Sequence, residues 1–253
     1  MHRALSWAGY AMVPADRLAY LEAQAVRGDK AANLGMLAEE EMGRAQGLLG
    51  ESLSQLNQDY FVLHETGWKR DGYFVEFGAT DGRSFNNTWL LEKTFGWTGI
   101  LAEPARVWRD ALQSSGRNAR LEFDCVWSKC GETLSFNEAS WAELSTLETF
   151  QTADGHRRRR AGSYPVQTVS LNDMLARHQA PRDMDYLSID TEGSEYEILK
   201  ALDFDRYRFG CITCEHNFTA NRERIHDLLA SRGYRRKFTE FSQFDDWYVR
   251  NET

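Results

Sequence analysis

The chain has no long hydrophobic run, and this absence bears on where the protein works. None of the apolar stretches in its 253 residues approaches the length of a membrane span. Residues 1–14 contain one arginine and only a short apolar stretch that aromatic residues interrupt, which is weak evidence for a targeting segment. We therefore expect a cytoplasmic protein without a membrane span.

Cysteine is also scarce. Four cysteines in a chain of this length do not build a disulfide scaffold. Cys211 and Cys214 form a CxxC pattern, but they lie inside a stretch that is typical of a buried strand. Cys125 and Cys130 are five residues apart and supply no second pair. The pattern favours buried thiols over a zinc site.

The chain has no basic excess. Its 38 acidic residues outnumber its 30 basic ones, which leaves a net charge of -8. Proteins that bind nucleic acids or anionic membrane surfaces recruit phosphates through a basic face, so we expect neither partner. The run Arg157–Arg160 is the exception, and its flanking glycines favour a mobile, solvated loop. The alternative is a basic cover over an acidic or phosphorylated acceptor, because arginine binds such groups through paired hydrogen bonds.

What the chain does have is enough apolar sequence, 42% of its residues, to bury one sizeable core. Residues 14–55 are rich in helix-forming residues. We predict an N-terminal helical appendage over residues 1–55 and a main domain over residues 56–253. For the appendage, the sequence favours a packing role or a contact within a homo-oligomer over a role in forming the substrate pocket. Its apolar positions are Leu18, Leu21, Ala25, Leu34 and Leu37.

From Asp71 onward, strand and helix patterns alternate. This alternation indicates an α/β fold in which helices cover a parallel sheet. Residues 127–165 interrupt the pattern, and we predict an insertion there with a hairpin around Gly131. The expected strands are residues 73–77, 98–102, 121–123, 185–189, 210–214 and 247–250, and the expected helices are 87–95, 105–115, 195–202 and 222–231.

A loop with two glycines, residues 76–82, follows the first expected strand. Gly78 and Gly82 allow a ligand to approach the backbone. Their spacing differs from the dinucleotide fingerprint, which has a third glycine. Glu76 and Asp81 would repel a pyrophosphate, whereas S-adenosylmethionine (SAM) presents a positive ammonium and a positive sulfonium. The loop therefore favours SAM over NAD.

Two further strand ends supply candidate cofactor contacts. Glu103 follows the second expected strand, where a carboxylate can accept hydrogen bonds from both ribose hydroxyls. Asp124 follows the third strand, where the adenine of a bound cofactor would lie, and we expect it or a nearby backbone amide to bind the adenine amine. Cys125 and Val126 would give the ring apolar contact.

A polar cluster is predicted where the fourth and fifth strands end. Asp190 and Glu192 precede a helix, and Glu195 suits the N-terminus of that helix. Glu215-His216-Asn217 reaches the same edge of the sheet. Three interpretations remain open: a Mg²⁺ site built on oxygen ligands, metal-free acid/base chemistry with His216 as the base, and a polar rim that only shapes the pocket.

The ordered motifs resemble the FkbM family of methyltransferases over roughly residues 54–249. Together they are far more specific than any one of them. They are Ser54-Gln55, Gln58-Asp59, Gly72 to Gly82, Ser84, Asn86-Asn87-Thr88, Leu91-Glu92-Lys93, Gly96 to Pro104, Val169 to Leu175, Asp185 to Leu199 and Glu215-His216-Asn217.

The resemblance implies a class I methyltransferase fold, with a mostly parallel seven-stranded sheet of Rossmann-like type and helices on both faces. It implies O-methylation, often of sugar hydroxyls in glycans, lipopolysaccharide or glycosylated metabolites. Related sugar O-methyltransferases hold a divalent metal at positions matching Asp190 and Glu215, with a base matching Glu192. His216 stands where many such relatives carry an acidic or amide group. Asp190 is expected to contact the cofactor from the end of the fourth strand. The cofactor contacts expected in the loop region are Glu76, Gly78, Thr80, Asp81, Gly82, Ser84 and Asn87.

The expected reaction is in-line transfer of the SAM methyl to a hydroxyl oxygen, with Glu192 or His216 taking the proton beside Asp190. His216 is also a candidate metal ligand, with Asp190 and Glu215. Two alternatives stay open, an NAD-dependent sugar oxidoreductase and a catalytically inactive module that binds SAM or glycans. The acceptor, a small molecule or a glycan, is not identified by the sequence. Aromatic residues that could stack on sugars, though core or wall positions are favoured for most, are Trp127, Trp141, Phe218 and Trp247.

Overall fold

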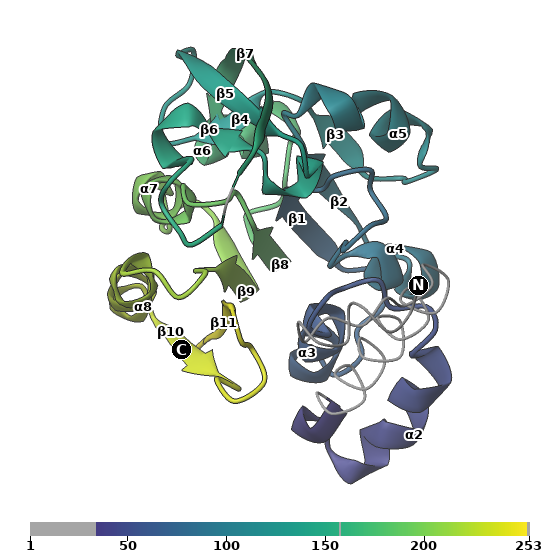
Figure 1. Ribbon diagram of the computed structural model, residues 1–253. Helices are drawn as coiled ribbons and strands as arrows, with labels where there is room; N and C mark the ends of the chain where they lie inside the picture. Colours follow the sequence, from purple (N-terminus) through teal and green to yellow (C-terminus); the bar gives the residue numbers. More distant parts are fainter. Residues whose placement is uncertain (1–33, 157, 252–253) are drawn as a thin grey trace, which may run out of the picture.

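The computed structural model describes residues 34–156 and 158–251 (Figure 1). A seven-stranded sheet forms its centre, in the order β10-β11-β9-β8-β1-β2-β3. All neighbours are parallel except β11, which runs antiparallel to β9 and β10. The strands are β1 (Tyr73–Phe77), β2 (Thr98–Ala102), β3 (Arg120–Glu122), β8 (Asp183–Ile189), β9 (Arg208–Glu215), β10 (Tyr234–Lys237) and β11 (Asp245–Arg250).

The strand order reverses at β1. From β1 the chain adds β2 and β3 on one side, and it later returns to add β8 and β9 on the other. In open α/β sheets, ligands bind outside the carboxyl ends of the strands at such a reversal. We therefore expect a ligand site at the carboxyl ends of β1, β2 and β8.

Helices cover both faces of this sheet because successive strand residues point in opposite directions. Val75 packs in the core shared with α6, α7 and α8, whereas Phe74 packs in the core shared with α3, α4 and α5. Figure 1 shows α7 and α8 on one side and α3 and α4 on the other. The predicted class I fold is confirmed. The helices are α3 (Gln58–Glu65), α4 (Trp89–Phe95), α5 (Arg109–Ser114), α6 (Leu171–Arg177), α7 (Glu195–Ala201) and α8 (Asn221–Ser231).

A second, four-stranded sheet occupies the region predicted as an insertion. Its order is β4-β7-β5-β6. The predicted hairpin around Gly131 is wrong, because β7 lies between β4 and β5 and pairs with both. The predicted solvated loop over the arginine run is also wrong at Arg160, which begins β7. The strands are β4 (Cys125–Trp127), β5 (Thr133–Ala139), β6 (Thr146–Leu147) and β7 (Arg160–Ser170), and the short 3-10 helices nearby are η3 (Arg106–Trp108), η4 (Ala142–Leu144) and η5 (Glu148–Phe150).

The described part of the predicted appendage consists of η2 (Leu34–Met36) and α2 (Glu39–Leu48). Leu34 and Ala45 are buried in the core that also contains α3. Glu41 accepts hydrogen bonds from Trp68 Nε1 at 2.6 Å and contacts His64 Nδ1 at 2.7 Å. These contacts tie residues 34–48 to the main domain. The remaining predicted positions, Leu18, Leu21 and Ala25, lie outside the described residues, as does Arg157.

Among residues 34–156 and 158–251, no helix combines the length and the apolar character that a membrane crossing requires.

Candidate active site

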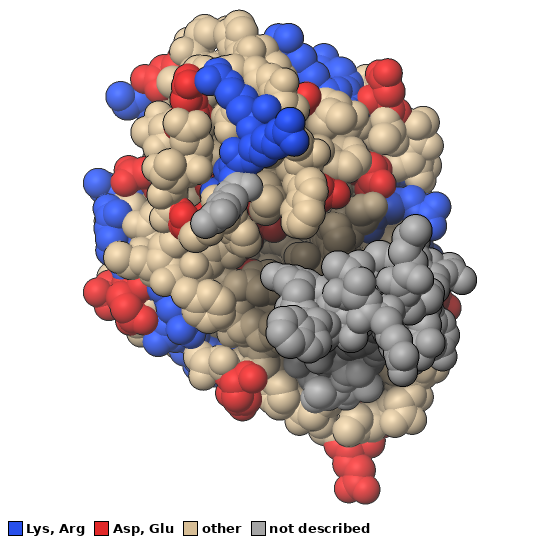
Figure 2. All heavy atoms as spheres, in the orientation of Figure 1, with Lys and Arg blue, Asp and Glu red and all other residues tan. Residues whose placement is uncertain are grey.

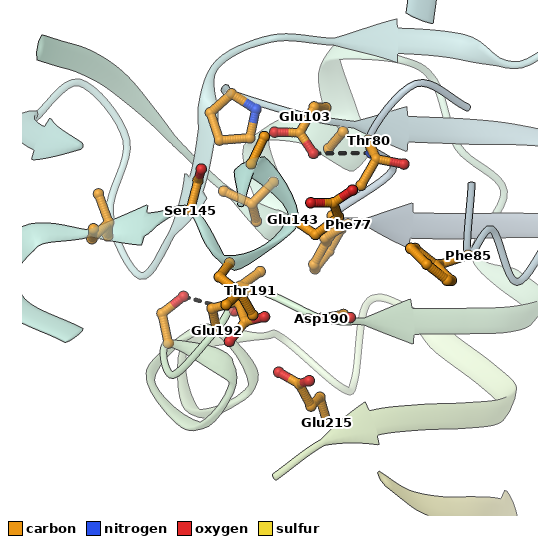
Figure 3. A pocket seen from close by; sticks show the side chains of 18 of the residues that line it. Phe77, Thr80, Phe85, Glu103, Glu143, Ser145, Asp190, Thr191, Glu192 and Glu215 are labelled. Carbon is orange, nitrogen blue, oxygen red and sulfur yellow. Dashed lines mark hydrogen bonds between the residues drawn. The ribbon is translucent and has the colours of Figure 1, made fainter. Parts of the chain in front are cut away.

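A cavity opens at the carboxyl ends of β1, β2, β8 and β9, and the small sheet closes one side of it (Figure 3). Its lining combines carboxylates with apolar side chains. From the main sheet come Phe77, Gly78, Thr80, Ala102, Glu103, Asp190, Thr191, Glu192 and Glu215, and from the small sheet and its loops come Cys125, Val126, Phe136, Glu143, Leu144, Leu147 and His156.

Both glycines of the loop occupy positions that exclude a side chain. Gly78 has φ +72°, and a Cβ there would lie 2.2 Å from the carbonyl oxygen of Asp190. Gly82 has φ +80°, and its Cβ would lie 2.8 Å from Leu112 Cδ1. The left-handed backbone and these close approaches require glycine. Gly78 lines the cavity, so the same approach that brings β1 against β8 leaves backbone exposed to a ligand.

Glu103 is buried at the end of β2 and faces the cavity. Its two oxygens accept hydrogen bonds from the backbone amides of Thr80 (3.0 Å) and Ala105 (2.8 Å). Burial raises the pKa of this carboxyl to about 7. Each carboxylate oxygen keeps a second acceptor position, so the geometry fits two hydroxyl donors on neighbouring carbons.

The acidic residues of the glycine loop bind the loop itself. Glu76 is buried and accepts hydrogen bonds from Asn87 N (2.8 Å) and Thr88 Oγ1 (2.5 Å), and burial raises its pKa. Asp81 accepts hydrogen bonds from the amides of Arg83 (2.8 Å) and Ser84 (2.7 Å). Neither carboxylate is part of the cavity lining. Both hold the backbone that frames it.

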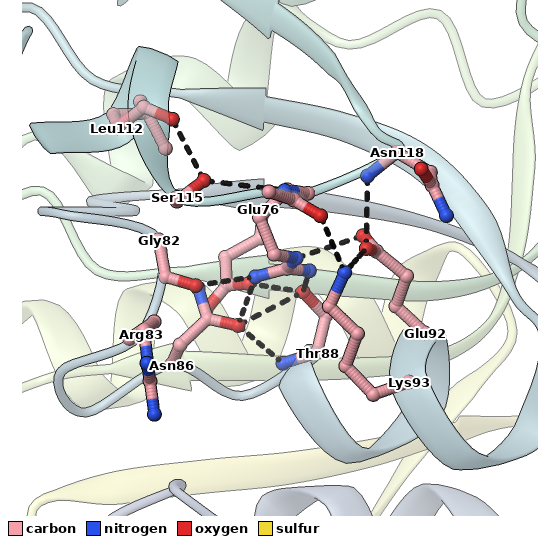
Figure 4. A network of polar contacts seen from close by, with 12 residues as sticks. Glu76, Gly82, Arg83, Asn86, Thr88, Glu92, Lys93, Leu112, Ser115 and Asn118 are labelled. Carbon is pink, nitrogen blue, oxygen red and sulfur yellow. Dashed lines mark hydrogen bonds and ion pairs between the residues drawn. The ribbon is translucent and has the colours of Figure 1, made fainter. Parts of the chain in front are cut away.

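Arg117 organises this loop from outside it, and sequence reasoning missed it. Figure 4 shows the polar network to which its partners Gly82, Thr88 and Glu92 belong. Its side chain is fully buried and donates to Glu92 Oε2 (2.7 Å) and to the carbonyl oxygen of Gly82 (2.8 Å). It also donates to Asn86 Oδ1 and Thr88 Oγ1. One cation thus joins the end of the glycine loop to α4 and offsets the buried charge of Glu92.

Of the predicted adenine contacts, two line the cavity and one does not. Cys125 and Val126 are buried in its wall, beside Phe136 and Leu147. Asp124 instead pairs with Arg177 at 2.9 Å. Asn87 donates to Ser188 Oγ beneath the loop, and Ser84 donates to Asp81.

Three carboxylates meet on the other side of the cavity from Glu103 (Figure 3). Asp190, Glu192 and Glu215 each offer an oxygen within 4.8 Å of the others. Burial raises the pKa of each of them, and their mutual repulsion adds to the shift in Glu192 and Glu215. Glu195 accepts hydrogen bonds from the amides of Thr191 and Gly193 at the start of α7, as the helix role predicts.

Glu192 is held by the small sheet. Its backbone has φ 59°, and its carbonyl oxygen accepts a hydrogen bond from Thr146 Oγ1 at 3.0 Å. Its carboxylate forms an ion pair with Arg158, which also binds both oxygens of Asp154, at 2.7 and 2.6 Å. The side chain of Arg158 is 1% exposed. The predicted solvated loop is therefore wrong for Arg158, because two buried carboxylates draw this arginine inward.

His216 does not join the three carboxylates. Its Nδ1 accepts a hydrogen bond from Phe218 N at 3.0 Å, and its Nε2 lies 3.8 Å from Asp246. Burial lowers its pKa. Glu215 and Asn217 line the cavity, whereas His216 faces away from it. Strand alternation does not separate Glu215 from His216, because β9 ends at Glu215 and His216 lies in the turn that follows.

A known protein family matches the greater part of the chain. The family model of the methyltransferase FkbM domain matches residues 76–236 of the sequence, which is more than half of the chain. No curated protein sequence gives a significant match. Solved structures with distant similarity include precorrin-6y C5,15-methyltransferase from Geobacter metallireducens (11% identity, 76% of this chain and 88% of that one, TM-score 0.42). A TehB-like SAM-dependent methyltransferase from Corynebacterium glutamicum shares 11% identity over 85% of this chain and 97% of that one, with a TM-score of 0.40. The chain belongs to the FkbM family of SAM-dependent methyltransferases.

Proposed function

We propose that the protein transfers the methyl group of SAM to a hydroxyl oxygen of a sugar, in a glycan, a lipopolysaccharide or a glycosylated metabolite. The observation that carries the proposal is the placement of Asp190, Glu192 and Glu215 in the same cavity as Glu103. A cofactor held at Glu103 would extend toward three groups that can accept a proton.

The charges of the cavity suit SAM. Glu103 would accept hydrogen bonds from the ribose hydroxyls, and the adenine would lie against Val126 and Phe136. The positive sulfonium and ammonium would lie toward Asp190 and Glu215, at the ends of β8 and β9. The same carboxylates would repel the pyrophosphate of NAD, which disfavours the oxidoreductase alternative.

The reaction needs orientation and removal of one proton. The acceptor oxygen attacks the methyl carbon as the carbon–sulfur bond breaks, and the electron pair of that bond stays on sulfur. The hydroxyl proton passes to a carboxylate, for which Glu192 is our candidate because Arg158 and Thr146 fix its position. The products are a methyl ether, S-adenosylhomocysteine and a proton.

The same carboxylates fit a divalent cation. Three oxygens within 4.8 Å of one another form the oxygen-rich donor set that Mg²⁺ prefers, and Asp190 and Glu215 would hold the ion. A bound ion supplies Lewis-acid polarisation of the acceptor hydroxyl. A second set of that size, Asp154, His156 and Glu192, is less suitable because Arg158 already binds two of its members.

Incubation with methyl-labelled SAM and fractionated glycans from the source cells tests the proposal. We expect alkali-stable label in a sugar, as a methyl ether gives, and loss of labelling in Glu192→Gln. Glu143→Gln is the matched control, because Glu143 lines the same cavity but is exposed. Parallel reactions with a chelator, and with Mg²⁺ restored, report the metal requirement. Label confined to nitrogen or carbon acceptors would contradict O-methylation, and full activity of Glu192→Gln would contradict its role as base.

A further inference from the structure

A depression lies next to the cavity, where β5 ends. It is lined by Ala139, Ser140, Trp141, Leu144, His156, Arg158 and Arg159. Leu144 and His156 also line the main cavity, so the two spaces share a wall. A molecule reacting in the cavity would extend into the depression if it were longer than one sugar unit.

Trp141 is 76% exposed, which is rare for so large an apolar side chain. Ser140, the residue before Trp141, donates its backbone N–H to the carbonyl oxygen of Arg159 at 2.7 Å. This backbone contact places an exposed indole and an exposed guanidinium in one depression. An indole face stacks on the C–H face of a sugar, and a guanidinium binds a carboxylate or phosphate through paired hydrogen bonds.

Arg158 and Arg159 are consecutive but have opposite surroundings. Arg158 turns inward and is neutralised by Asp154 and Glu192. Arg159 is exposed, and within residues 34–156 and 158–251 its side chain has no ion pair. In a protein of net charge -8, such a cation beside the cavity is available for an anionic ligand. Figure 2 shows basic side chains gathered above the hollowed centre of this face of the molecule.

We propose that this depression binds an anionic sugar unit of the acceptor, adjacent to the unit that is methylated. The inference rests on the proposed sugar O-methylation and adds the charge class of the substrate. Trp141 would stack on the ring, and Arg159 would bind its carboxylate, phosphate or sulfate.

The test separates the labelled glycans by anion exchange after reaction with methyl-labelled SAM. We expect the label in the retained, anionic fraction. Phosphatase treatment, desulfation and reduction of carboxyl groups, each applied to the acceptor before reaction, will identify the anionic group. Arg159→Gln and Trp141→Ala should each raise the KM for this fraction about tenfold with little change in kcat. Arg160→Gln is the control, because Arg160 is equally basic but exposed outside the depression and paired with Glu148 at 3.6 Å.

The outcomes separate this inference from the function on which it rests. Label in the neutral sugar fraction, or an unchanged KM in both variants, overturns the anionic subsite and leaves O-methylation standing. Equal effects of Arg159→Gln and Arg160→Gln would indicate general electrostatic attraction and also overturn the subsite. No label in any glycan overturns both proposals.

Discussion

Two buried arginines hold the two sides of the cavity, and they do so in different ways. Arg117, on the side of the glycine loop, binds one carboxylate, one carbonyl and two neutral side-chain oxygens. Arg158, on the side of the small sheet, binds two carboxylates, one of which lines the cavity. The first arrangement fixes the shape of a backbone loop. The second ties the small sheet to Glu192, the candidate base, and places a positive charge beside its carboxylate.

Replacement of Arg117 should give the largest effect on stability. Arg117→Met leaves the buried carboxyl groups of Glu92 and Glu76 without this cation, and losing one partner of a buried ion pair costs about 3–5 kcal/mol. Urea unfolding at neutral pH measures the change. Lys93→Met is the control, because Lys93 contacts the same Glu92 from a partly exposed position and should cost less than about 1 kcal/mol. Equal losses in the two variants would contradict the special role of Arg117.

Glu103 differs from Glu92 in having only backbone donors and no paired cation among the described residues. Its pKa of about 7 in the folded protein exceeds its ordinary value of 4.5, so the native state holds the proton more tightly than the unfolded chain. Its contribution to stability is therefore present at low pH and declines as the pH rises through about 7.

Glu103→Gln removes that decline. Relative to the wild type, the variant should gain about 3 kcal/mol of stability between pH 4.5 and pH 8, as the shift of Glu103 implies. Urea unfolding of both proteins across this range provides the measurement. Parallel stability curves would show that Glu103 titrates normally.

Arg158→Met should act on turnover rather than on the cofactor. Without Arg158, Glu192 loses the contact that orients it, and misplacement of a catalytic group by about 1 Å can cost about 100-fold in rate. We expect kcat to fall by that order while the SAM dissociation constant stays near that of the wild type. Partial recovery in Arg158→Lys would support positioning. Loss of SAM binding as large as the loss of kcat would argue that the small sheet supports the whole cavity.

His216→Gln should have the smallest effect. His216 faces Asp246 rather than the cavity, so removing its imidazole should leave kcat and its pH profile close to those of the wild type. A pH profile of labelled-methyl transfer by the two proteins makes the comparison. If the variant's profile lacked one of the pH-dependent limbs seen in the wild type, His216 would be the base.

The cofactor side could be predicted further from sequence than the acceptor side. β1 and β2 were predicted with their observed bounds, because short apolar strands and the turns that end them are local features. Glu103 follows from the rule that ligands bind at the carboxyl ends of parallel strands. The two glycines were recognised, although close packing against Asp190 and Leu112 also accounts for them.

The remaining features depend on contacts between distant segments. Arg117 is 35 residues from the carbonyl of Gly82, and nothing in its local sequence indicates burial. Arg158 lies in a run of arginines that resembles a solvated loop, and only its approach to Glu192, 34 residues away, reveals its role. β4 pairs with β7, and no local pattern specifies a strand partner about 40 residues later.

Calorimetric titration of SAM into Glu103→Gln and Glu192→Gln at pH 8 tests most directly whether the two sides have separate roles. We expect Glu103→Gln to weaken SAM binding about tenfold, because each lost ribose contact is a charge-assisted hydrogen bond. Glu192→Gln should bind SAM as the wild type does. Wild-type affinity in Glu103→Gln, together with weakened binding in Glu192→Gln, would contradict the account.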